Sequence, residues 1–463
     1  MRVQIAWGVW WLVLTLAWWL VGGASMLALT PAEEGFVWQL RQHALYLSGV
    51  WSVGMMSLVM LLSLRQPWME KPLGGMDRVY RLHKWAGISA AVAAVLHWGA
   101  KESSGWIKTL WGTAGRLGHD PVLAWATELR GTGKDLGEWA FYALLIMVVL
   151  TLWQRLLPYR PWRMLHRVMP VLYLMLVMHT LILMPLAFWQ FPMGVLMAAL
   201  LAVGSAAALW SLAGRIGRGR HSYAAQVHAV RRWGQGEGTT LLEVLCALPA
   251  HWPGHRPGQF VFVCFEDSEG PHPFTIASAP GGCGTADDGR ALLRLLIKPL
   301  GDYTRSLGAA LQPGQKLRIE GPYGLFDGQC AAQRQPVWVA GGVGITPFFA
   351  MLQARQPSAE HVAEGEVPAV DAQEVDLHYC SRNAAADPVV PQLQTLCAHA
   401  QPAVRLHVHD AARGQYLQPQ DLAQHGAPLD IWFCGPKGLG QMLHRATVRQ
   451  RGWRMHQEAF QMR

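Results

Sequence analysis

The chain has 463 residues, a formal net charge of +9 at pH 7 and an apolar fraction of 51%, which is enough chain for two or three domains. All seven cysteines lie between Cys246 and Cys434 without a C-x-x-C or zinc-like spacing, so we expect free thiols rather than a disulfide scaffold or a zinc site. The sequence contains no basic run with interleaved aromatic residues, and nucleic acid is therefore not an expected partner.

Long runs without Asp, Glu, Lys or Arg predict six membrane-spanning helices in residues 1–214, in contact with a lipid bilayer. These runs cover residues 3–32, 44–64, 85–100, 139–154 and 168–214, and Pro185 and Pro192 divide the last one in two. The first run is longer than the apolar core of a secretion signal, so we expect it to remain as a helix.

Lys and Arg residues cluster after the second, fourth and sixth expected helices. The positive-inside rule assigns these connections to the cytoplasm, which predicts that both termini and the second half of the chain lie inside, most simply at a bacterial inner membrane. The residues concerned are Arg65, Lys71, Arg78, Arg81, Lys84, Arg155, Arg160, Arg163, Arg167, Arg215, Arg218 and Arg220.

Four histidines in the apolar half form two pairs with similar spacing. His83 and His97 are fourteen residues apart, and His166 and His179 are thirteen apart. In a helix either spacing amounts to about 20 Å along the axis. If His83 faces His166 and His97 faces His179, each pair can supply the two axial ligands of a b-type haem, one near each side of the membrane. The alternative is a set of buried histidines hydrogen-bonded to the backbone. A step of thirteen changes the helix face, so we expect an irregular turn near Pro170.

From residue 221 the pattern changes to short β-rich runs separated by Gly and Pro, which predicts an antiparallel barrel or sandwich over residues 221–330. It contains the motifs HPFTIAS at 272–278, KPLGDYT at 298–304 and GPYG at 321–324. Residues 335–463 alternate strand and helix and predict an α/β, Rossmann-like domain. There GGVGITP at 341–347 follows a strand, and a CGP turn at 434–436 follows a later one.

In this order the first three motifs resemble the flavin-binding domain of the ferredoxin reductase superfamily. The resemblance implies bound FAD, and His272 stands where soluble members usually carry Arg. Near the end of the chain, Glu458 and Phe460 resemble the terminal segment whose aromatic residue stacks on the flavin. The implied FAD contacts are His272, Pro273, Phe274, Thr275, Ala277, Ser278, Lys298, Gly301, Tyr303, Thr304, Gly321 and Phe460.

The glycine-rich and CGP turns resemble the nicotinamide nucleotide domain of the same superfamily. A guanidinium at Arg382 suits a 2′-phosphate, so we favour NADPH and keep NADH as the alternative. Cys434 is a candidate neighbour of the nicotinamide, although a packed small side chain fits its position equally well, and no catalytic side chain is assigned. The implied nucleotide contacts are Gly341, Gly342, Gly344, Thr346, Pro347, Ser381, Arg382, Cys434, Gly435 and Pro436.

Across nearly its whole length the chain resembles the ferric reductase and NADPH oxidase superfamily, whose third and fifth helices carry histidines at these two spacings. The resemblance implies a multi-domain protein: a six-helix haem bundle, an antiparallel FAD domain and an α/β nucleotide domain. It implies electron transfer from cytoplasmic NADPH through FAD and two b-type haems to an acceptor on the outer face. We favour a ferric chelate. The alternatives are O2 reduced to superoxide, a periplasmic partner protein, and a membrane anchor or transporter with a vestigial reductase half, which the intact motifs disfavour.

Overall fold

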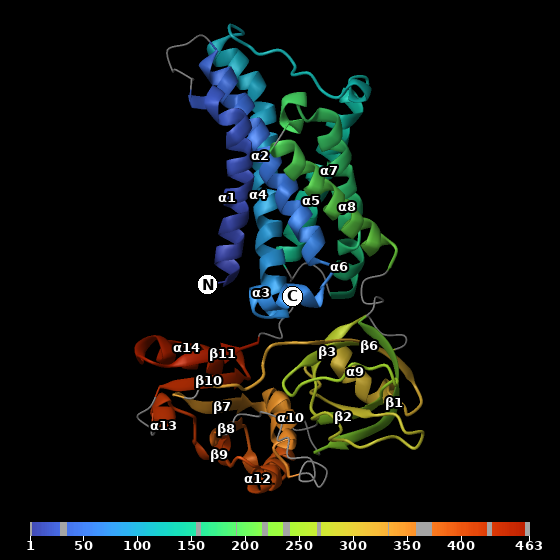
Figure 1. Cartoon of the computed structure of the whole chain (residues 1–463), viewed down its shortest axis with the longest axis vertical. Helices are drawn as coiled ribbons and strands as arrows, with labels where there is room; N and C mark the ends of the chain where they lie inside the picture. The colour runs from blue at the N-terminus through green and yellow to red at the C-terminus, as the bar shows by residue number, and fades with distance from the viewer. Residues whose placement is uncertain are drawn as a thin grey trace. The chain divides into compact units, whose positions relative to one another are not determined.

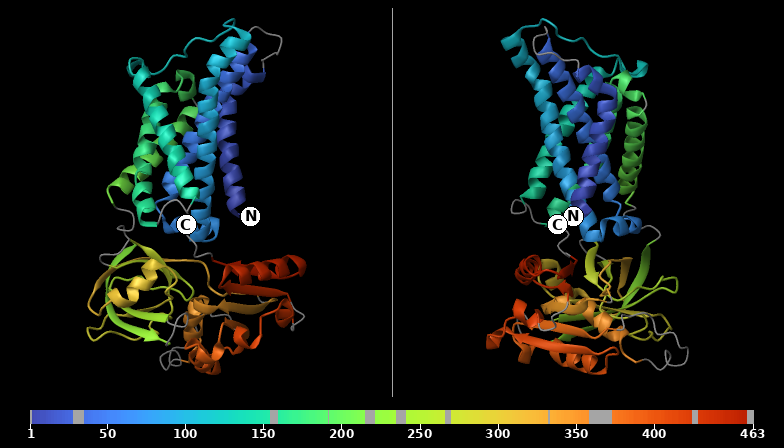
Figure 2. Two further views of the ribbon diagram at one scale, coloured as in Figure 1. Left: turned by 180° about the vertical axis from the view of Figure 1, so that it is seen from behind. Right: turned by 60° about the vertical axis from the view of Figure 1, so that its left-hand side comes forward.

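The computed structural model describes residues 2–27, 35–153, 159–190, 192–214, 221–234, 241–265, 270–331, 333–357, 373–423 and 428–458. The chain forms two compact units, Met1–Ile216 and Gly217–Arg463 (Figure 1). The first unit is helical, and the second contains one antiparallel and one parallel sheet (Figure 2). The division between them falls in the segment where the sequence changes from long apolar runs to short strands.

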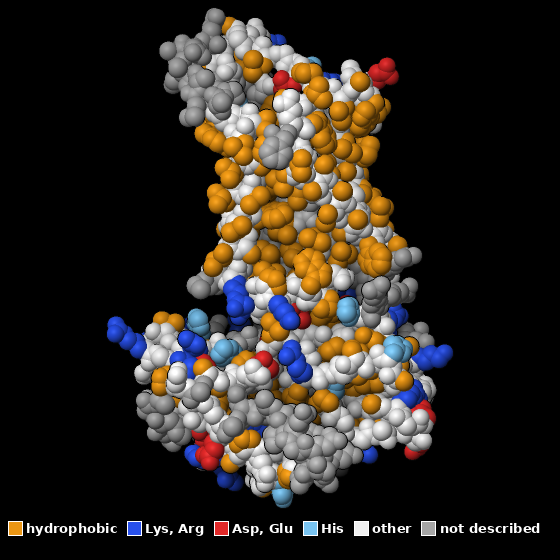
Figure 3. Space-filling view, in the orientation of Figure 1, with side chains coloured by type: hydrophobic (Ala, Val, Ile, Leu, Met, Phe, Trp, Pro, Cys, Tyr) orange, Lys and Arg blue, Asp and Glu red, His pale blue; other side chains and the backbone are white. Residues whose placement is uncertain are grey.

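The helices of the first unit follow the apolar runs of the sequence. Hydrophobic side chains cover the outside of this unit on the face that Figure 3 shows, as expected for a surface that meets lipid rather than water. The long helices are α1 (Arg2–Leu27), α2 (Phe36–Leu62), α4 (Met76–Trp111), α5 (Arg130–Leu152), α7 (Met169–Leu183) and α8 (Met193–Leu212). The short elements are η1 (Pro67–Met69), α3 (Glu70–Leu73), η2 (Ala124–Ala126), α6 (Tyr159–His166) and η3 (Leu186–Trp189).

Five helical stretches in the described part of the chain are long and apolar enough to cross a membrane. The expected span at 85–100 is not among them; it lies within α4, where Lys84 and Lys101 limit the uncharged run to 16 residues. The sixth span therefore stays a prediction. The five stretches are Arg2–Gly23, Phe36–Leu62, Arg130–Leu152, Pro161–Leu183 and Met193–Leu212.

Helix α2 lies at the centre of the bundle and contacts α1, α4, α7 and α8. Small residues permit this close packing, because without water between the helices the backbones must approach one another to gain contacts. A Cβ atom added at Gly54 of α2 would lie 2.5 Å from a methyl group of Leu14 in α1. In the same way, a Cβ atom at Gly204 of α8 would lie 2.0 Å from the Tyr173 hydroxyl of α7.

The irregular turn expected near Pro170 is confirmed. Helix α6 ends at His166 and α7 begins at Met169, with Pro170 in its first turn. Proline has no N–H to donate to the preceding turn, and the first turn of a helix is where that loss is tolerated. The break changes the helix face between His166 and His179, as the thirteen-residue spacing requires.

The antiparallel sheet of the second unit has the strand order β4-β3-β6-β1-β2-β5. A bridge between Ile276 and Leu295 links its two edges, so the sheet curls around a core that includes Val244, Val261 and Leu293. Helix α9 (Asp302–Ala310) follows the edge strand β5 in the chain. The strands are β1 (Ser222–Trp233), β2 (Leu241–Ala247), β3 (Phe260–Phe265), β4 (His272–Thr275), β5 (Leu292–Ile297) and β6 (Lys316–Tyr323).

The parallel sheet has the order β11-β10-β7-β8-β9, so the direction of strand addition reverses between β7 and β10. Open α/β sheets bind ligands at such a reversal, outside the carboxyl ends of the strands. The strands are β7 (Gln335–Gly341), β8 (Val375–Ser381), β9 (Val404–Asp410), β10 (Leu429–Cys434) and β11 (Arg454–Gln457). Between them lie η4 (Gly342–Ile345), α10 (Thr346–Ala354), η5 (Ala384–Ala386), α12 (Val389–His399), η6 (Ala411–Arg413), α13 (Pro419–Leu422) and α14 (Lys437–Arg449).

One hydrophobic cluster spans the junction between the two sheets of the second unit. Leu296 and Phe326 of the antiparallel part pack in the same cluster as Phe348 and Phe349 of α10. Polar contacts reinforce the junction, because Gln353 of α10 donates to the Gly282 carbonyl at 2.8 Å and accepts from the Ala279 amide at 3.1 Å. These contacts connect the part of the unit that carries HPFTIAS, KPLGDYT and GPYG with the part that carries the glycine-rich and CGP turns.

Candidate functional site

His97 of α4 and His179 of α7 face each other inside the helical unit. Their ring centroids are 6.1 Å apart, and the ring planes are nearly perpendicular at 86°. Each Nδ1 is hydrogen-bonded to a backbone carbonyl, that of Leu45 at 2.8 Å for His97 and that of Gly133 at 2.7 Å for His179. Because a carbonyl only accepts, each Nδ1 carries the proton, and each neutral ring keeps its Nε2 lone pair for a metal.

His83 and His166 form the second pair, at the α4 and α6 positions that the spacing predicts. They lie close enough to interact electrostatically, and His83 Nδ1 donates to the Val59 carbonyl at 3.1 Å. His166 stacks on Trp162, with centroids 5.2 Å apart. Its Nδ1 is buried, and among the described residues it has no hydrogen-bond partner. A buried orphan nitrogen is costly and calls for a ligand or a bound water.

The distance between the His97 and His179 ring centroids suits two imidazoles that bind one haem iron. Metal–imidazole bonds of about 2 Å on opposite sides of one ion put the two ring centroids about 6 Å apart. The described residues contain no cluster of three or more His, Cys, Asp or Glu that could hold a metal ion. A haem needs only its two axial ligands from the protein, so a pair is sufficient.

Glycines leave room for these imidazoles. A Cβ atom at Gly137 of α5 would lie 2.2 Å from His179 Nδ1, and one at Gly49 of α2 would lie 3.2 Å from the His97 ring. Sequence reasoning missed both glycines and the anchoring carbonyls. Gly133 and Gly137 are one helical turn apart, but they lie among the charged residues at the start of α5, so their spacing was a weak signal.

In the second unit, the flavin-type motifs converge at one end of the antiparallel sheet. Phe260 of β3 pairs with Thr275 of β4 on one side and with Tyr323 of β6 on the other, so HPFT and GPYG are one strand apart. His272 stacks on Tyr303 of α9 with centroids 3.7 Å apart and planes 16° from parallel. The ring pair brings the first and second motifs together, as a shared FAD site requires.

The Thr304 side chain stabilises the turn at the start of α9. Its Oγ1 accepts hydrogen bonds from the amides of Leu300 at 2.9 Å and Gly301 at 3.1 Å. The Thr304 hydroxyl therefore caps the turn instead of being directed to a ligand. The amides of the next turn have no partner within the helix, and such groups suit a phosphate.

Two expected FAD contacts are used inside the protein. The Ala277 carbonyl accepts both Nε and Nη2 of Arg294, at 3.1 and 2.7 Å, and Ser278 Oγ accepts from the Arg294 amide at 3.1 Å. Arg294 also lies 3.8 Å from Glu243. Both residues are fully buried, at the junction with α10, and their expected contact with FAD stays a prediction.

The chain end approaches the third motif. Glu458 Oε1 accepts from the Leu325 amide at 2.8 Å, and Gly324, with φ +108°, allows this close approach. Phe460 lies outside the described residues, so its expected stacking stays a prediction.

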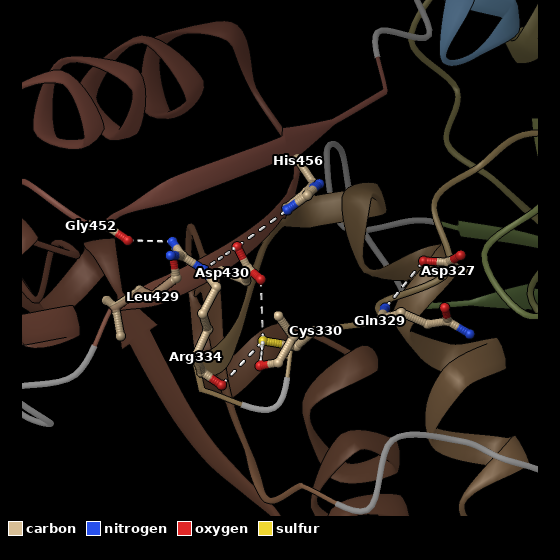
Figure 4. A network of polar contacts seen from close by, with 9 residues as sticks. Asp327, Gln329, Cys330, Arg334, Leu429, Asp430, Gly452 and His456 are labelled. Atoms are coloured by element: carbon tan, nitrogen blue, oxygen red, sulfur yellow. Dashed lines mark hydrogen bonds and ion pairs between the residues drawn. The ribbon is translucent and has the colours of Figure 1, made fainter. Parts of the chain in front are cut away.

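A network of polar contacts holds the strand that leads to Glu458 (Figure 4). Asp430 of β10 pairs with Arg334 at 2.9 Å and contacts His456 of β11 at 3.4 Å, and Cys330 donates to it at 3.3 Å. Arg334 also donates to the carbonyls of Leu429 and Gly452. The network ties β11 and the segment after GPYG to β10. Sequence reasoning missed it, since its members are scattered over 127 positions.

The glycine-rich and CGP turns are packed against each other at the carboxyl edge of the parallel sheet. A Cβ atom at Gly344 would lie 2.1 Å from the Cys434 carbonyl oxygen, and one at Gly341 would lie 2.5 Å from Pro436. Gly342 has φ +56°, a conformation that favours glycine. Only bare backbone fits here, which leaves the turn open for the close approach of a pyrophosphate. Thr346 donates to the Val343 carbonyl at 2.6 Å and so shapes this turn from within.

The region expected to hold a 2′-phosphate contains two cations. Arg382 is exposed, and Lys298 lies close to it and to Gly342. Burial first, and then the Arg382 charge, lower the pKa of Lys298, while Asp387 opposes them. Lys298 Nζ would lie 3.7 Å from a Cβ atom added at Gly342, so this residue is close to the nucleotide turn, and its expected contact with FAD stays a prediction. Ser381 donates to Asp387 at 2.6 Å, so its hydroxyl turns inward.

Cys434 is buried beside the CGP turn. Burial, with a smaller contribution from Glu458, raises the pKa of its thiol to about 12. The thiol stays protonated at neutral pH, which excludes the thiolate that a nucleophile needs. Its place fits a packed small side chain next to Gly344.

Two family models match the chain. Residues 48–177 match the ferric reductase like transmembrane component, and residues 236–327 match an FAD-binding domain. The chain is also 36% identical over 98 residues to ferric reduction oxidase 7, chloroplastic, of Arabidopsis thaliana, covering 18% of this chain and 12% of that protein. It is 30% identical over 118 residues to a superoxide-generating NADPH oxidase heavy chain of Dictyostelium discoideum, covering 21% of each.

A ferric reductase-like transmembrane component and an FAD-binding domain thus occur in one chain, which supports a relationship to the ferric reductase and NADPH oxidase superfamily. The chain is also similar to the vanillate O-demethylase oxidoreductase of Pseudomonas putida, with 30% identity over 162 residues. That match covers 34% of this chain and 45% of the relative. The chain thus spans less than half of the length of each of these relatives.

Proposed function

We propose that this protein is an oxidoreductase that carries electrons from cytoplasmic NADPH, through FAD and two b-type haems, to an acceptor on the outer face of a bacterial inner membrane. The observation that carries the proposal is the pair of facing imidazoles, His97 and His179, each with Nδ1 anchored on a carbonyl and Nε2 left for a metal. His83 and His166 would hold the inner haem in the same way.

When bound, flavin accepts a hydride and releases single electrons, and haem iron carries one electron at a time. The chain's own residues bind and orient these groups. The carbonyls of Leu45 and Gly133 fix the tautomer and the ring orientation of the axial histidines. With Nδ1 donating to a carbonyl, the Nε2 lone pair of each ring would be available to a haem iron.

In the second unit, the His272–Tyr303 pair and the amides of α9 would bind FAD, and the Gly341–Gly344 turn would bind the nicotinamide nucleotide. Lys298 and Arg382 supply positive charge for its phosphates, which favours NADPH over NADH. The hydrophobic cluster at the junction of the two sheets would keep the two nucleotide sites next to each other.

We favour a ferric chelate as the acceptor. To test this, the purified full-length protein would be supplied with FAD, reduced anaerobically with NADPH, and then given ferric citrate or air while the haem spectrum is recorded. Fast reoxidation by ferric citrate, with little superoxide in air, supports a ferric reductase. Fast reoxidation by air with superoxide supports an oxidase, and slow reoxidation by both favours a periplasmic protein acceptor.

The same preparation tests the route. His97→Ala should remove one haem and stop haem reoxidation, while NADPH still reduces the flavin. Loss of flavin reduction in this variant, with the second unit folded, would contradict separate haem and flavin sites.

A further inference from the structure

The last helix and the edge strand of the second unit carry positive charge that no acidic side chain balances. Residues 437–457, which include α14 and β11, contain five Lys or Arg residues and no Asp or Glu. All five are exposed, and none forms an ion pair with a residue in the described part of the chain. Lys, Arg and His side chains gather at this edge of the unit (Figure 3). We call the set the basic edge; it consists of Lys437, Arg445, Arg449, Arg451 and Arg454.

Helix α14 presents part of the basic edge on its outward face. Its buried positions are Gly440, Leu443 and Ala446. At about 100° per residue, Lys437, Arg445 and Val448 lie on the opposite side of the helix. Val448 is 76% exposed between these cations. A helix that lies on a bilayer places its apolar side chains in the headgroup region and its Lys and Arg on the phosphates, and this face can do both.

A groove of about 420 Å³ between α13 and α14 continues the basic edge. Arg445 and Arg449, one helical turn apart, line it, and the amide side chains of Gln420, Gln441 and Gln450 lie beside them. The described residues that line the groove include no Asp or Glu. A guanidinium binds two phosphate oxygens at once, and the amides add neutral donors. The groove therefore suits a phosphate-bearing headgroup.

The chain itself keeps the second unit near a source of such phosphates. Helix α8, one of the stretches that are long and apolar enough to span a membrane, ends at Leu212, and β1 begins at Ser222. An extended chain rises by at most about 3.6 Å per residue, so these two residues are at most about 35 Å apart. The unit cannot diffuse away from the bilayer, and lipid headgroups are always available to it.

We propose that the basic edge is a docking surface for the headgroups of anionic phospholipids. Each Lys or Arg near an anionic bilayer favours binding by about fivefold, and the attraction decays within about 10 Å. Anionic lipid thus positions α14 and the CGP turn from which this helix starts. The inference depends on the membrane-spanning character of the chain and not on its electron route.

The test uses the full-length protein in nanodiscs of phosphatidylcholine alone or of phosphatidylcholine mixed with phosphatidylglycerol. Phenylglyoxal, an uncharged reagent, labels accessible arginines, and mass spectrometry gives the rate at each site. We expect the rates at Arg445, Arg449 and Arg451 to fall about fivefold or more in the anionic nanodiscs. Sodium chloride at about 1 M, where the Debye length is about 3 Å, should restore them.

Arg413 is the internal control. Its side chain is 72% exposed, and it follows β9, the strand at the opposite edge of the parallel sheet from β11. Its labelling rate should be the same in both lipids.

A double variant, Arg445→Gln with Arg449→Gln, tests whether the basic edge binds lipid as a unit. Loss of two charges should raise the labelling rate of Arg451 in anionic nanodiscs towards its value in neutral ones. Arg413→Gln, which removes one exposed charge from the opposite edge, should leave that rate unchanged. Labelling of Arg413 at the wild-type rate in the double variant would show that the second unit is still folded.

Equal labelling of the basic edge in the two lipids would overturn the proposal. An equally large fall at Arg413 would do the same, because it would reflect a general effect of the anionic nanodisc on the reagent. Soluble tripolyphosphate is the competing occupant. If it protects Arg445 and Arg449 in neutral nanodiscs while anionic lipid does not, the groove binds a soluble phosphate compound and the docking surface is refuted.

Discussion

The substitution Gly137→Ala directly affects His179, one of the four histidines that we propose as haem ligands. The added Cβ atom would lie 2.2 Å from Nδ1 and 2.4 Å from Cε1 of His179. Ordinary contacts between such atoms are about 3.5–4.0 Å. The ring must therefore move by more than about 1 Å, which breaks its hydrogen bond to the Gly133 carbonyl.

Overpacking of this kind costs about 1–3 kcal/mol, which corresponds to a loss of about 5- to 150-fold in affinity for a group that needs the original ring position. We expect the haem content of the purified protein to fall from two per chain towards one, measured as the pyridine haemochrome, with only one redox transition left in a potentiometric titration.

The matched control is Gly131→Ala in the same helix, where an added Cβ atom meets nothing within 4 Å. Alanine has the higher helix propensity, so this variant should keep both haems and full stability. If Gly137→Ala retains two haems with the wild-type spectrum, His179 does not ligate a haem from the position described above.

Three further outcomes are expected in the second unit. Gly344→Ala forces a methyl group against the Cys434 carbonyl and should slow flavin reduction by NADPH about tenfold or more, whereas Gly438→Ala, with nothing within 4 Å, should not. Arg382→Ala should raise the Michaelis constant for NADPH much more than that for NADH in steady-state assays; an equal rise would remove the phosphate contact. Burial first, and then neighbouring imidazoles, lower the pKa of His378 to about 3. The unfolded chain takes up this proton near pH 6.5, so stability should fall as the pH drops from about 7 towards 3, by up to about 1.4 kcal/mol per pH unit. The free energy of unfolding, measured by denaturant titration at a series of pH values, should change less with pH in His378→Asn than in the wild-type protein.

The membrane half could be predicted where a local pattern determines the outcome. Uncharged runs were sufficient to predict α1, α2, α5 and α8, and Pro170 was sufficient to predict the break between α6 and α7. Helix α4 shows the limit of that reasoning. It extends to 36 residues because its polar ends continue the helix well beyond the uncharged segment, so its length and its apolar span differ.

The glycine turns were predictable for a related reason. At Gly341 and Gly344 the backbone itself makes the close contact, so residue type and position in the strand–turn–helix pattern are enough. Side-chain roles were harder to predict. Ser381 and Ser278 stand in the right motifs, but Asp387 and Arg294 from other segments take their hydrogen bonds.

The least predictable contacts are those made by groups that every residue carries. The carbonyls of Leu45, Val59 and Gly133 orient three of the four histidines, and no sequence pattern distinguishes one carbonyl from the next. Which carbonyl lies next to an imidazole depends on the offset between two packed helices, and the packing of the whole bundle sets that offset. The histidine spacing therefore predicts the depth of each site, whereas the ring orientation that makes Nε2 available depends on tertiary structure. The role of Gly137 depends on tertiary structure too, since only the packed helices show that its missing side chain makes room for His179.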